Sequence, residues 1–129
     1  GVTVQAMAPK GREVILGAVR DPRFGPLVMF GLGGIYAEAL KDVAFRLAPL
    51  RPLSAERMLD EIRGSAILGQ FRGAPAVDRA ALSECLQRLS QLMVEFPVIA
   101  ELDMNPIILH DDGVLAVDAR VVLTQPVAE

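Results

Sequence analysis

The sequence of 129 residues contains no tryptophan, one tyrosine and one cysteine. A single cysteine, Cys85, cannot form an internal disulfide, which suits a reducing, cytoplasmic setting. Hydrophobic residues make up 52% of the chain and aromatic residues only 5%, so the core must be aliphatic. This apolar content excludes intrinsic disorder. The length fits one domain, expected to span residues 1–129.

Long apolar runs and clusters of basic charge are also lacking. No apolar run approaches the roughly 18 residues that a transmembrane helix needs. Thirteen basic and sixteen acidic residues give a net charge of −3, and neither lysine nor arginine occurs in runs. Sequence-independent binding to nucleic acid or to an acidic membrane is therefore disfavoured. The sequence predicts a cytoplasmic protein with no nucleic acid and no membrane among its partners.

Glycine and proline divide the first quarter of the chain into short segments rich in β-formers. These segments predict strands at residues 2–5, 13–21, 27–30 and 42–47. The period then changes to that of a helix. Ser54 is expected to cap a helix that runs to about Arg63, and residues 65–70 to add a turn or two. Asp78 is expected to cap a longer helix that ends before Pro97.

Strands return at residues 98–109 and 114–123, on either side of a hairpin signal at residues 110–113. The order of four strands, two helices and two strands lacks regular alternation of strand and helix. It predicts an α+β fold, with a largely antiparallel sheet and helices packed on one face. Cys85 lies on the apolar stripe of the second helix, so it is predicted to be a small buried hydrophobe rather than a nucleophile.

Polar side chains line one face of the predicted strand at residues 98–109. Because side chains alternate along a strand, Glu101, Asp103 and Asn105 share a face. If the hairpin loop is residues 110–113, Asn105 lies opposite Asp118 and Asp103 lies opposite Arg120. A two-residue loop at 112–113 would shift this pairing by two positions and keep the face, whereas a three-residue loop would break it.

Carboxylate and amide oxygens from two adjacent strands are the ligands that Mg²⁺ takes when phosphates complete its coordination. The alternative is that these residues are only the solvated face of an amphipathic strand. Two observations favour function: Glu, Asp, Asn and Pro are poor strand formers, and Asp118 interrupts an otherwise apolar strand. The segment therefore predicts a magnesium-phosphate site.

Two further candidates lie in loops. Gly31, Gly33 and Gly34 follow an apolar strand, where glycine lets backbone N–H groups approach a phosphate. They match neither the dinucleotide-binding nor the Walker pattern, and a tight structural turn is the alternative. Arg72 could clamp a phosphate, or be solvated or cap a helix. His110 is expected to be an exposed turn residue.

An ordered set of short motifs covers nearly the whole chain. In order, the motifs are VQAM at 4–7, GRE at 11–13 with Gly17, DPRFGP at 21–26, FGLGGI at 30–35 with Glu38 and Asp42, PL at 49–50, RG at 72–73 with Asp78, ELDMNP at 101–106 and VDAR at 117–120. This set resembles the ATP-grasp domain of NDP-forming acyl-CoA synthetases, which are related to the β subunit of succinyl-CoA synthetase. The resemblance implies a nucleotide held between two α+β subdomains, of which this chain is the second, C-terminal one.

The resemblance also implies roles for individual residues. Along the adenine it implies Gln5, Ala6 and Met7, with Glu13 as the acid near the hinge. For Mg²⁺ at the phosphates of ATP, ADP or another nucleotide it implies Asn105 with Asp118. Less directly, it implies supporting roles for Glu101, Asp103, Arg72 and Arg120. Near the transferred phosphoryl group it implies the loop of Gly31, Gly33 and Gly34 with Glu38.

Family members interconvert an acyl-CoA, NDP and phosphate with a carboxylate, CoA and NTP through a phosphohistidine. His110 does not fill that role, so no catalytic residue is expected here and the isolated chain should be inactive. The expected partners are the rest of a parent synthetase: a first ATP-grasp subdomain, a CoA-binding domain and a ligase domain. Alternatives are a synthetase-like protein fused to an acetyltransferase, or a non-catalytic regulatory module. Exposed apolar surface would allow the fragment to dimerise.

Overall fold

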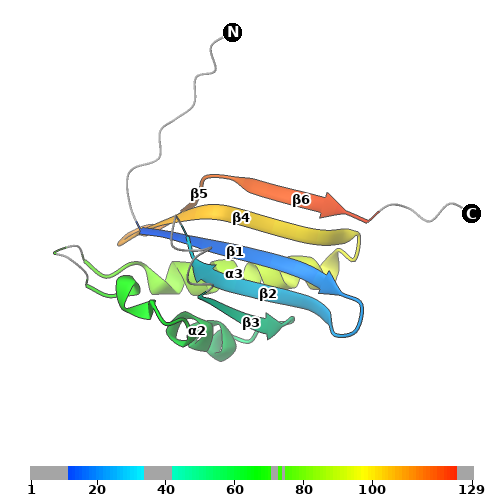
Figure 1. The fold of residues 1–129 in the computed structure, drawn as a ribbon, viewed down its shortest axis with the longest axis horizontal. Helices are drawn as coiled ribbons and strands as arrows, with labels where there is room; N and C mark the ends of the chain where they lie inside the picture. Colours follow the sequence, from blue (N-terminus) through cyan, green and yellow to red (C-terminus); the bar gives the residue numbers. More distant parts are fainter. Residues whose placement is uncertain (1–11, 34–41, 71–72, 74, 125–129) are drawn as a thin grey trace, which may run out of the picture.

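The computed structural model describes residues 12–33, 42–70, 73 and 75–124. It is a six-stranded antiparallel sheet with two α-helices on one face, which confirms the predicted α+β class (Figure 1). The strands, in chain order, are β1 (Arg12–Asp21), β2 (Gly25–Leu32), β3 (Val43–Leu47), β4 (Ile99–His110), β5 (Gly113–Ala116) and β6 (Ala119–Leu123). Their spatial order is β3-β2-β1-β4, and both β5 and β6 pair with β4. The strand expected at residues 2–5 lies outside the described residues.

The helices within the described residues are α2 (Pro52–Glu61), the short 3₁₀ helix η1 (Ser65–Leu68) and α3 (Arg79–Glu95). The predicted cap of α3 is confirmed, since the Asp78 carboxylate accepts the N–H of Ala81 at 3.0 Å. The predicted cap of α2 is wrong. This helix begins at Pro52, because proline has a fixed φ suited to the first turn and no N–H to leave unpaired. Neither α-helix in the described ranges has the length and apolar character of a membrane span.

A buried carboxylate determines where α2 ends. Asp42 precedes β3 and is only 8% exposed. Its carboxylate accepts the backbone N–H groups of Arg63 and Gly64 at 2.6 and 2.7 Å, just beyond the last turn of the helix. The helix therefore stops at Glu61 rather than near Arg63 as predicted, and Asp42 links β3 to the α2–η1 junction.

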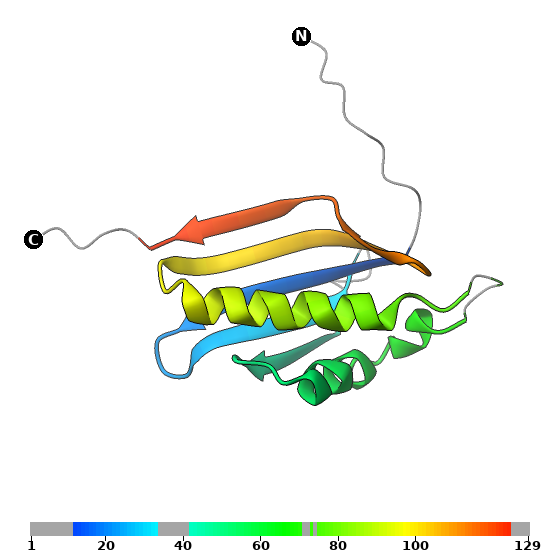
Figure 2. The ribbon, with the colours of Figure 1, turned by 180° about the vertical axis from the view of Figure 1, so that it is seen from behind.

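The helices cover one face of the sheet, as the view from behind shows (Figure 2), and the core lies between these two layers. Alternate residues of β1, namely Val14, Leu16 and Ala18, point toward this layer and are buried. α3 contacts β1, β2 and β5, while α2 contacts β3. The buried side chains are aliphatic apart from Phe30 and three polar residues. Burial of this apolar area holds the two layers together.

Two arginines at the ends of β1 bind the sheet to the helical layer. The Arg12 guanidinium donates to the carbonyl oxygens of Ile67, Gly69 and Pro75. The Arg20 guanidinium donates at 2.7–3.3 Å to the carbonyl oxygens of Met93, Phe96 and Ile99. Arg20 thus satisfies carbonyls at the C-terminal end of α3, where a positive charge is also favoured by the helix dipole.

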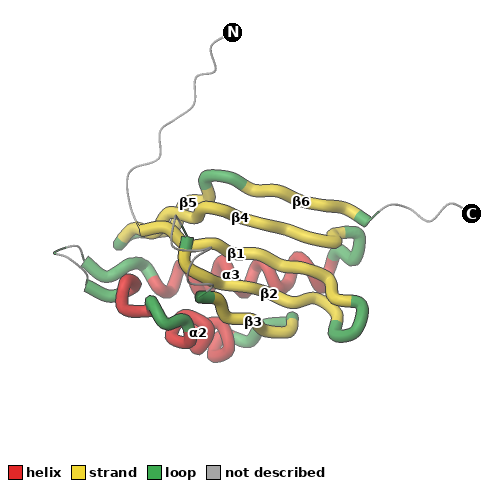
Figure 3. The backbone as a smooth tube through the Cα atoms, in the orientation of Figure 1, coloured by secondary structure: helices red, strands yellow, loops and turns green. Residues whose placement is uncertain are grey.

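The hairpin after β4 fixes the register of the polar strand. Leu109 pairs with Val114 as predicted, but His110 also pairs with Gly113, so the turn contains only residues 111 and 112. The expected strand at 114–123 is split into β5 and β6, with a break that runs along the edge of β4 (Figure 3). The break lies opposite Pro106, which has no N–H to donate to a ladder. Because the turn contains only residues 111 and 112, His110 is the last residue of β4 and is half-buried, not the exposed turn residue that the sequence predicted.

Candidate functional site

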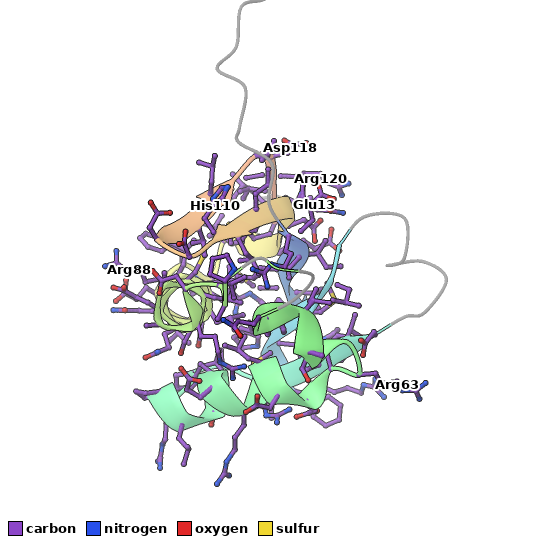
Figure 4. The ribbon with its side chains drawn as sticks, turned by 90° about the vertical axis from the view of Figure 1, so that its left-hand side faces the viewer. Glu13, Arg63, Arg88, His110, Asp118 and Arg120 are labelled. Carbon is purple, nitrogen blue, oxygen red and sulfur yellow. The ribbon has the colours of Figure 1, made fainter. Side chains whose placement is uncertain are left out.

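Four of the predicted site residues line one hollow at the edge of the sheet. Asp103 and Asn105 come from β4, Asp118 from the break between β5 and β6, and Arg120 from β6. Together with Ala119 they line a hollow of about 180 Å³. In Figure 4, Asp118 and Arg120 lie together at this edge, away from α3.

The register of the hairpin brings these residues together. Asp103 pairs with Arg120, as the sequence predicted from the Leu109–Val114 pair. Across the break two backbone hydrogen bonds continue the ladder: the Asn105 N–H donates to the Asp118 carbonyl oxygen at 3.2 Å, and the Val117 N–H donates to the Pro106 carbonyl oxygen at 3.1 Å. Because the side-chain period of a strand is two, Asp103 and Asn105 reach the same hollow.

Charges at the site are mixed. The Arg120 guanidinium lies 3.6 Å from the Glu101 carboxylate, and both side chains are well exposed. An exposed pair of this kind adds little to folding stability. Arg120 instead places one positive charge beside Glu101, Asp103 and Asp118, which offsets part of their mutual repulsion.

The oxygen donors fit a magnesium ion that arrives with phosphates. In the part of the chain that the structure describes, no group of three or more His, Cys, Asp or Glu residues could hold a metal by itself. Mg²⁺, however, is commonly bound by one or two carboxylates with substrate phosphates and water as the remaining ligands. Asn105 offers an amide oxygen and Asp118 a carboxylate, and both residues are exposed to the hollow.

A second hollow, of about 230 Å³, adjoins the first on the open face of the sheet. Asp103 lines both hollows. The other lining residues of the second hollow are mostly apolar and come from β1, β2, β3 and β4: Gly17, Ala18, Val19, Leu27, Met29, Phe45 and Glu101. The sequence prediction did not include this hollow, although the alternation of β1 indicates that Gly17 and Val19 share a face.

The glycines Gly31 and Gly33 each have a packing reason. A Cβ on Gly31 would lie 2.7 Å from Val43 Cγ1 and 2.9 Å from the Asp42 carbonyl oxygen. A Cβ on Gly33 would lie 3.1–3.2 Å from atoms of Glu13. The Gly33 N–H donates to the Glu13 carbonyl oxygen at 3.1 Å, so this N–H is engaged within the sheet.

The structure places Glu13 and His110 outside the lining of the two hollows. Glu13 is exposed on β1, and Figure 4 shows it on the same side of the sheet as Arg120. His110 lines neither hollow, and its carbonyl oxygen accepts the Asp78 N–H at 2.8 Å. Six predicted residues lie outside the described residues: Gln5, Ala6, Met7, Gly34, Glu38 and Arg72.

Cys85 lies on α3, away from both hollows. It is partly buried and packs against the core, and this burial raises the pKa of the Cys85 thiol. A raised pKa disfavours the thiolate, which is the nucleophilic form. The environment therefore agrees with the predicted packing role.

Comparisons with known proteins match nearly the whole chain to one family. A family model described as an ATP-grasp domain matches residues 1–123. The β subunit of ADP-forming acetate–CoA ligase I from Pyrococcus furiosus is 49% identical over 123 residues, which are 95% of this chain and 53% of the relative. The ADP-forming 4-hydroxybutyrate–CoA ligase of Nitrosopumilus maritimus is 46% identical over 113 residues, 88% of this chain and 16% of the relative. The chain thus spans about half the length of the first of these relatives and far less of the second.

A solved structure shares the fold. The dinucleotide-forming acetyl-coenzyme A synthetase 1 of Candidatus Korarchaeum cryptofilum, in complex with coenzyme A and Mg-AMPPCP, aligns with a TM-score of 0.88 and 47% identity over 91% of this chain and 55% of that chain. The family match, the identity and the shared fold all point the same way. This chain therefore belongs to the ATP-grasp domain family of ADP-forming acyl-CoA synthetases.

Proposed function

We propose that this chain supplies the nucleotide- and magnesium-binding second subdomain of an NDP-forming acyl-CoA synthetase. The observation that carries the proposal is the polar hollow lined by Asp103, Asn105, Asp118 and Arg120. The related synthetase structure with Mg-AMPPCP and coenzyme A supports it, because that protein shares both fold and sequence with this chain. The parent enzyme would interconvert an acyl-CoA, NDP and phosphate with a carboxylate, CoA and NTP.

In this proposal the chain binds and orients rather than performing covalent chemistry. Asn105 and Asp118 hold Mg²⁺, and Asp103 and Glu101 support the site. Bound Mg²⁺ offsets negative charge on the phosphate oxygens during transfer. Arg120 adds a fixed positive charge beside the phosphates. In the same proposal Glu13 would be the acid near the hinge between the two subdomains, and Gln5, Ala6 and Met7 would bind the adenine.

The proposed organisation is one domain, residues 1–129, that works with other parts of a cytoplasmic synthetase. A first ATP-grasp subdomain would close the nucleotide site from the other side. A CoA-binding domain and a ligase domain would supply the acyl and CoA sites, and the phosphohistidine would lie outside this chain. By itself the chain is expected to show no turnover.

The test is calorimetric titration of Mg-ADP into the protein that contains the complete nucleotide site. Asn105→Ala and Asp118→Ala should each weaken binding by about tenfold or more, because each removes one oxygen ligand. Asp111→Ala is the matched control, since Asp111 is an exposed residue of the hairpin turn and lines neither hollow. Equal affinity of the wild type and both site variants would contradict the proposal.

A further inference from the structure

Gly17 lies in the interior of β1, where the backbone alone does not call for glycine. It pairs with Asp103 of β4 on one side and with Met29 of β2 on the other. Among the described glycines, positive φ values occur at Gly25, Gly73 and Gly113, not at this position. A glycine inside a strand destabilises it by roughly 0.5–1 kcal/mol relative to alanine. Backbone conformation therefore does not require glycine at position 17. We look instead at the space that a side chain would need there.

The space above Gly17 is occupied by the Asp103 carboxylate. A Cβ built on Gly17 would lie 3.2 Å from Asp103 Oδ1 and 3.2 Å from Met29 Cε. Both atoms are ends of side chains that meet over β1 from the two neighbouring strands. A methyl group at position 17 would displace the Asp103 oxygen, the Met29 methyl group or both by a few tenths of an ångström. The absence of a side chain at position 17 therefore leaves room for the Asp103 carboxylate over β1.

In this placement the carboxylate lies between two hollows. Asp103 lines the polar hollow with Asn105 and Asp118, and it also lines the apolar hollow that contains Gly17. We infer that Gly17 is a positioning residue that holds the Asp103 carboxylate at the border of the two hollows. The inference rests on the proposed function, because Asp103 acts there as the acid beside the Mg²⁺ site. A displaced Asp103 oxygen weakens the negative field that favours the cation.

The experiment compares Gly17→Ala and Gly17→Val with the wild type in the protein that contains the complete nucleotide site. Affinity for ADP is measured by calorimetry with Mg²⁺ and with EDTA. Gly17→Ala should weaken Mg-ADP binding roughly threefold to tenfold, and Gly17→Val should weaken it more, while metal-free ADP binds as before. Unchanged Mg-ADP affinity in Gly17→Ala would overturn the inference, as would an equal loss with and without Mg²⁺.

Two controls separate positioning from folding. Gly69→Ala is the matched glycine variant, because a Cβ there meets only the Ala66 carbonyl oxygen at an ordinary 3.7 Å. Its Mg-ADP affinity should equal that of the wild type. Thermal melts of Gly17→Ala should stay near the wild-type value, since alanine suits a strand at least as well as glycine.

A double-mutant cycle tests the route through Asp103. In an Asp103→Ala background, Gly17→Ala should have no further effect on Mg-ADP affinity, and a full additional loss would overturn the inference. Failure of the proposed function looks different. If Asn105→Ala and Asp118→Ala leave Mg-ADP affinity unchanged, the nucleotide site itself is misassigned. If they lose affinity and Gly17→Ala does not, only the role of Gly17 falls.

Discussion

The two faces of the sheet carry different kinds of side chain although they belong to the same strands. On the face that α2 and α3 cover, Val14, Leu16 and Phe30 are fully buried or nearly so. On the open face, Val19 and Phe45 are 39% and 49% exposed, and they lie beside the carboxylates of β4. The strand side chains buried on the covered face are apolar throughout. Those on the open face change from apolar at β2 and β3 to polar at β4 and β6.

This difference indicates two separate demands on the sequence. The covered face is explained by burial of apolar area together with a few polar side chains, such as Asp42 and Arg20, that pair with backbone groups of the helical layer. The open face contains residues that weaken a strand, such as Asp103 and Asn105, and nothing in the packing compensates for them. The proposed nucleotide site would account for their arrangement, because it would bind a polar ligand together with a cation.

The largest expected effect compares two phenylalanines on adjacent strands that point to opposite faces. Phe30→Ala should lower the free energy of unfolding by about 3–5 kcal/mol, since Phe30 is fully buried. Phe45→Ala on the open face should lower it by about 1 kcal/mol or less. Urea denaturation measures both. Equal losses would remove the energetic distinction between the two faces.

The second prediction concerns the buried acid of the covered face. Asp42→Ala leaves the N–H groups of Arg63 and Gly64 without their acceptor, so it should cost about 2–3 kcal/mol of folding stability. Asp60→Ala is the control, because the Asp60 side chain is 71% exposed and makes an ion pair at the surface. It should cost about 1 kcal/mol or less. A similar loss in both variants would show that burial of Asp42 adds nothing.

The third prediction tests the attachment of α3 to the sheet. Arg20→Met keeps most of the apolar stem but removes the donors to Met93, Phe96 and Ile99, and should cost about 1–2 kcal/mol. Arg23→Met is its control, since that side chain is 79% exposed and makes contacts at the surface alone, an ion pair with Asp21 and a cation–π contact with Phe24. Chemical denaturation of the two variants in parallel is the measurement. If both variants match the wild type, the guanidinium of Arg20 is not a helix cap.

The smallest effect lies at the rim of the covered face. A hydrogen bond from Arg46 lowers the pKa of the Glu61 carboxyl below its usual value. A lowered pKa gives stability that is present above the unfolded pKa and is lost as pH falls through the folded pKa. Since the pair is exposed, Glu61→Gln should cost only about 0.5 kcal/mol at pH 7. Denaturation from pH 7 to pH 3 should show this difference shrinking, and a constant difference would contradict the coupling.

Periodicity and turn chemistry predict much of this architecture. Alternation along residues 98–109 placed Asp103 and Asn105 on one face, and the Leu109–Val114 pair gave the correct partner for Asp103. The cap of α3 followed from Asp78. These features depend on neighbours in the chain or on one hairpin, so local rules suffice.

What the sequence did not reveal depends on contacts between distant segments. The Asp42 carboxylate accepts the N–H groups of Arg63 and Gly64, which follow α2 and are 21 and 22 positions later in the chain. No local sequence pattern indicates such a contact. Pro106 lies in β4, but the break occurs in the strand opposite it. The split between β5 and β6 can therefore be recognised only when the pairing of that strand with β4 is known. The role that we infer for Gly17 depends on Asp103, which is its partner across the β1–β4 ladder and far from it in sequence.

The central place of β1 has a consequence for how the protein is made. Its partner β2 follows directly in the chain, but its other partner, β4, comes after both helices. Arg20 and its acceptor Ile99 are 79 residues apart. During synthesis on a ribosome, β1, β2 and β3 can therefore pair early, while the other edge of β1 stays unpaired until β4 has been made. Closing so long a loop is slow, and Asp103 and Asn105 belong to β4, so we expect the proposed nucleotide site to form late in folding.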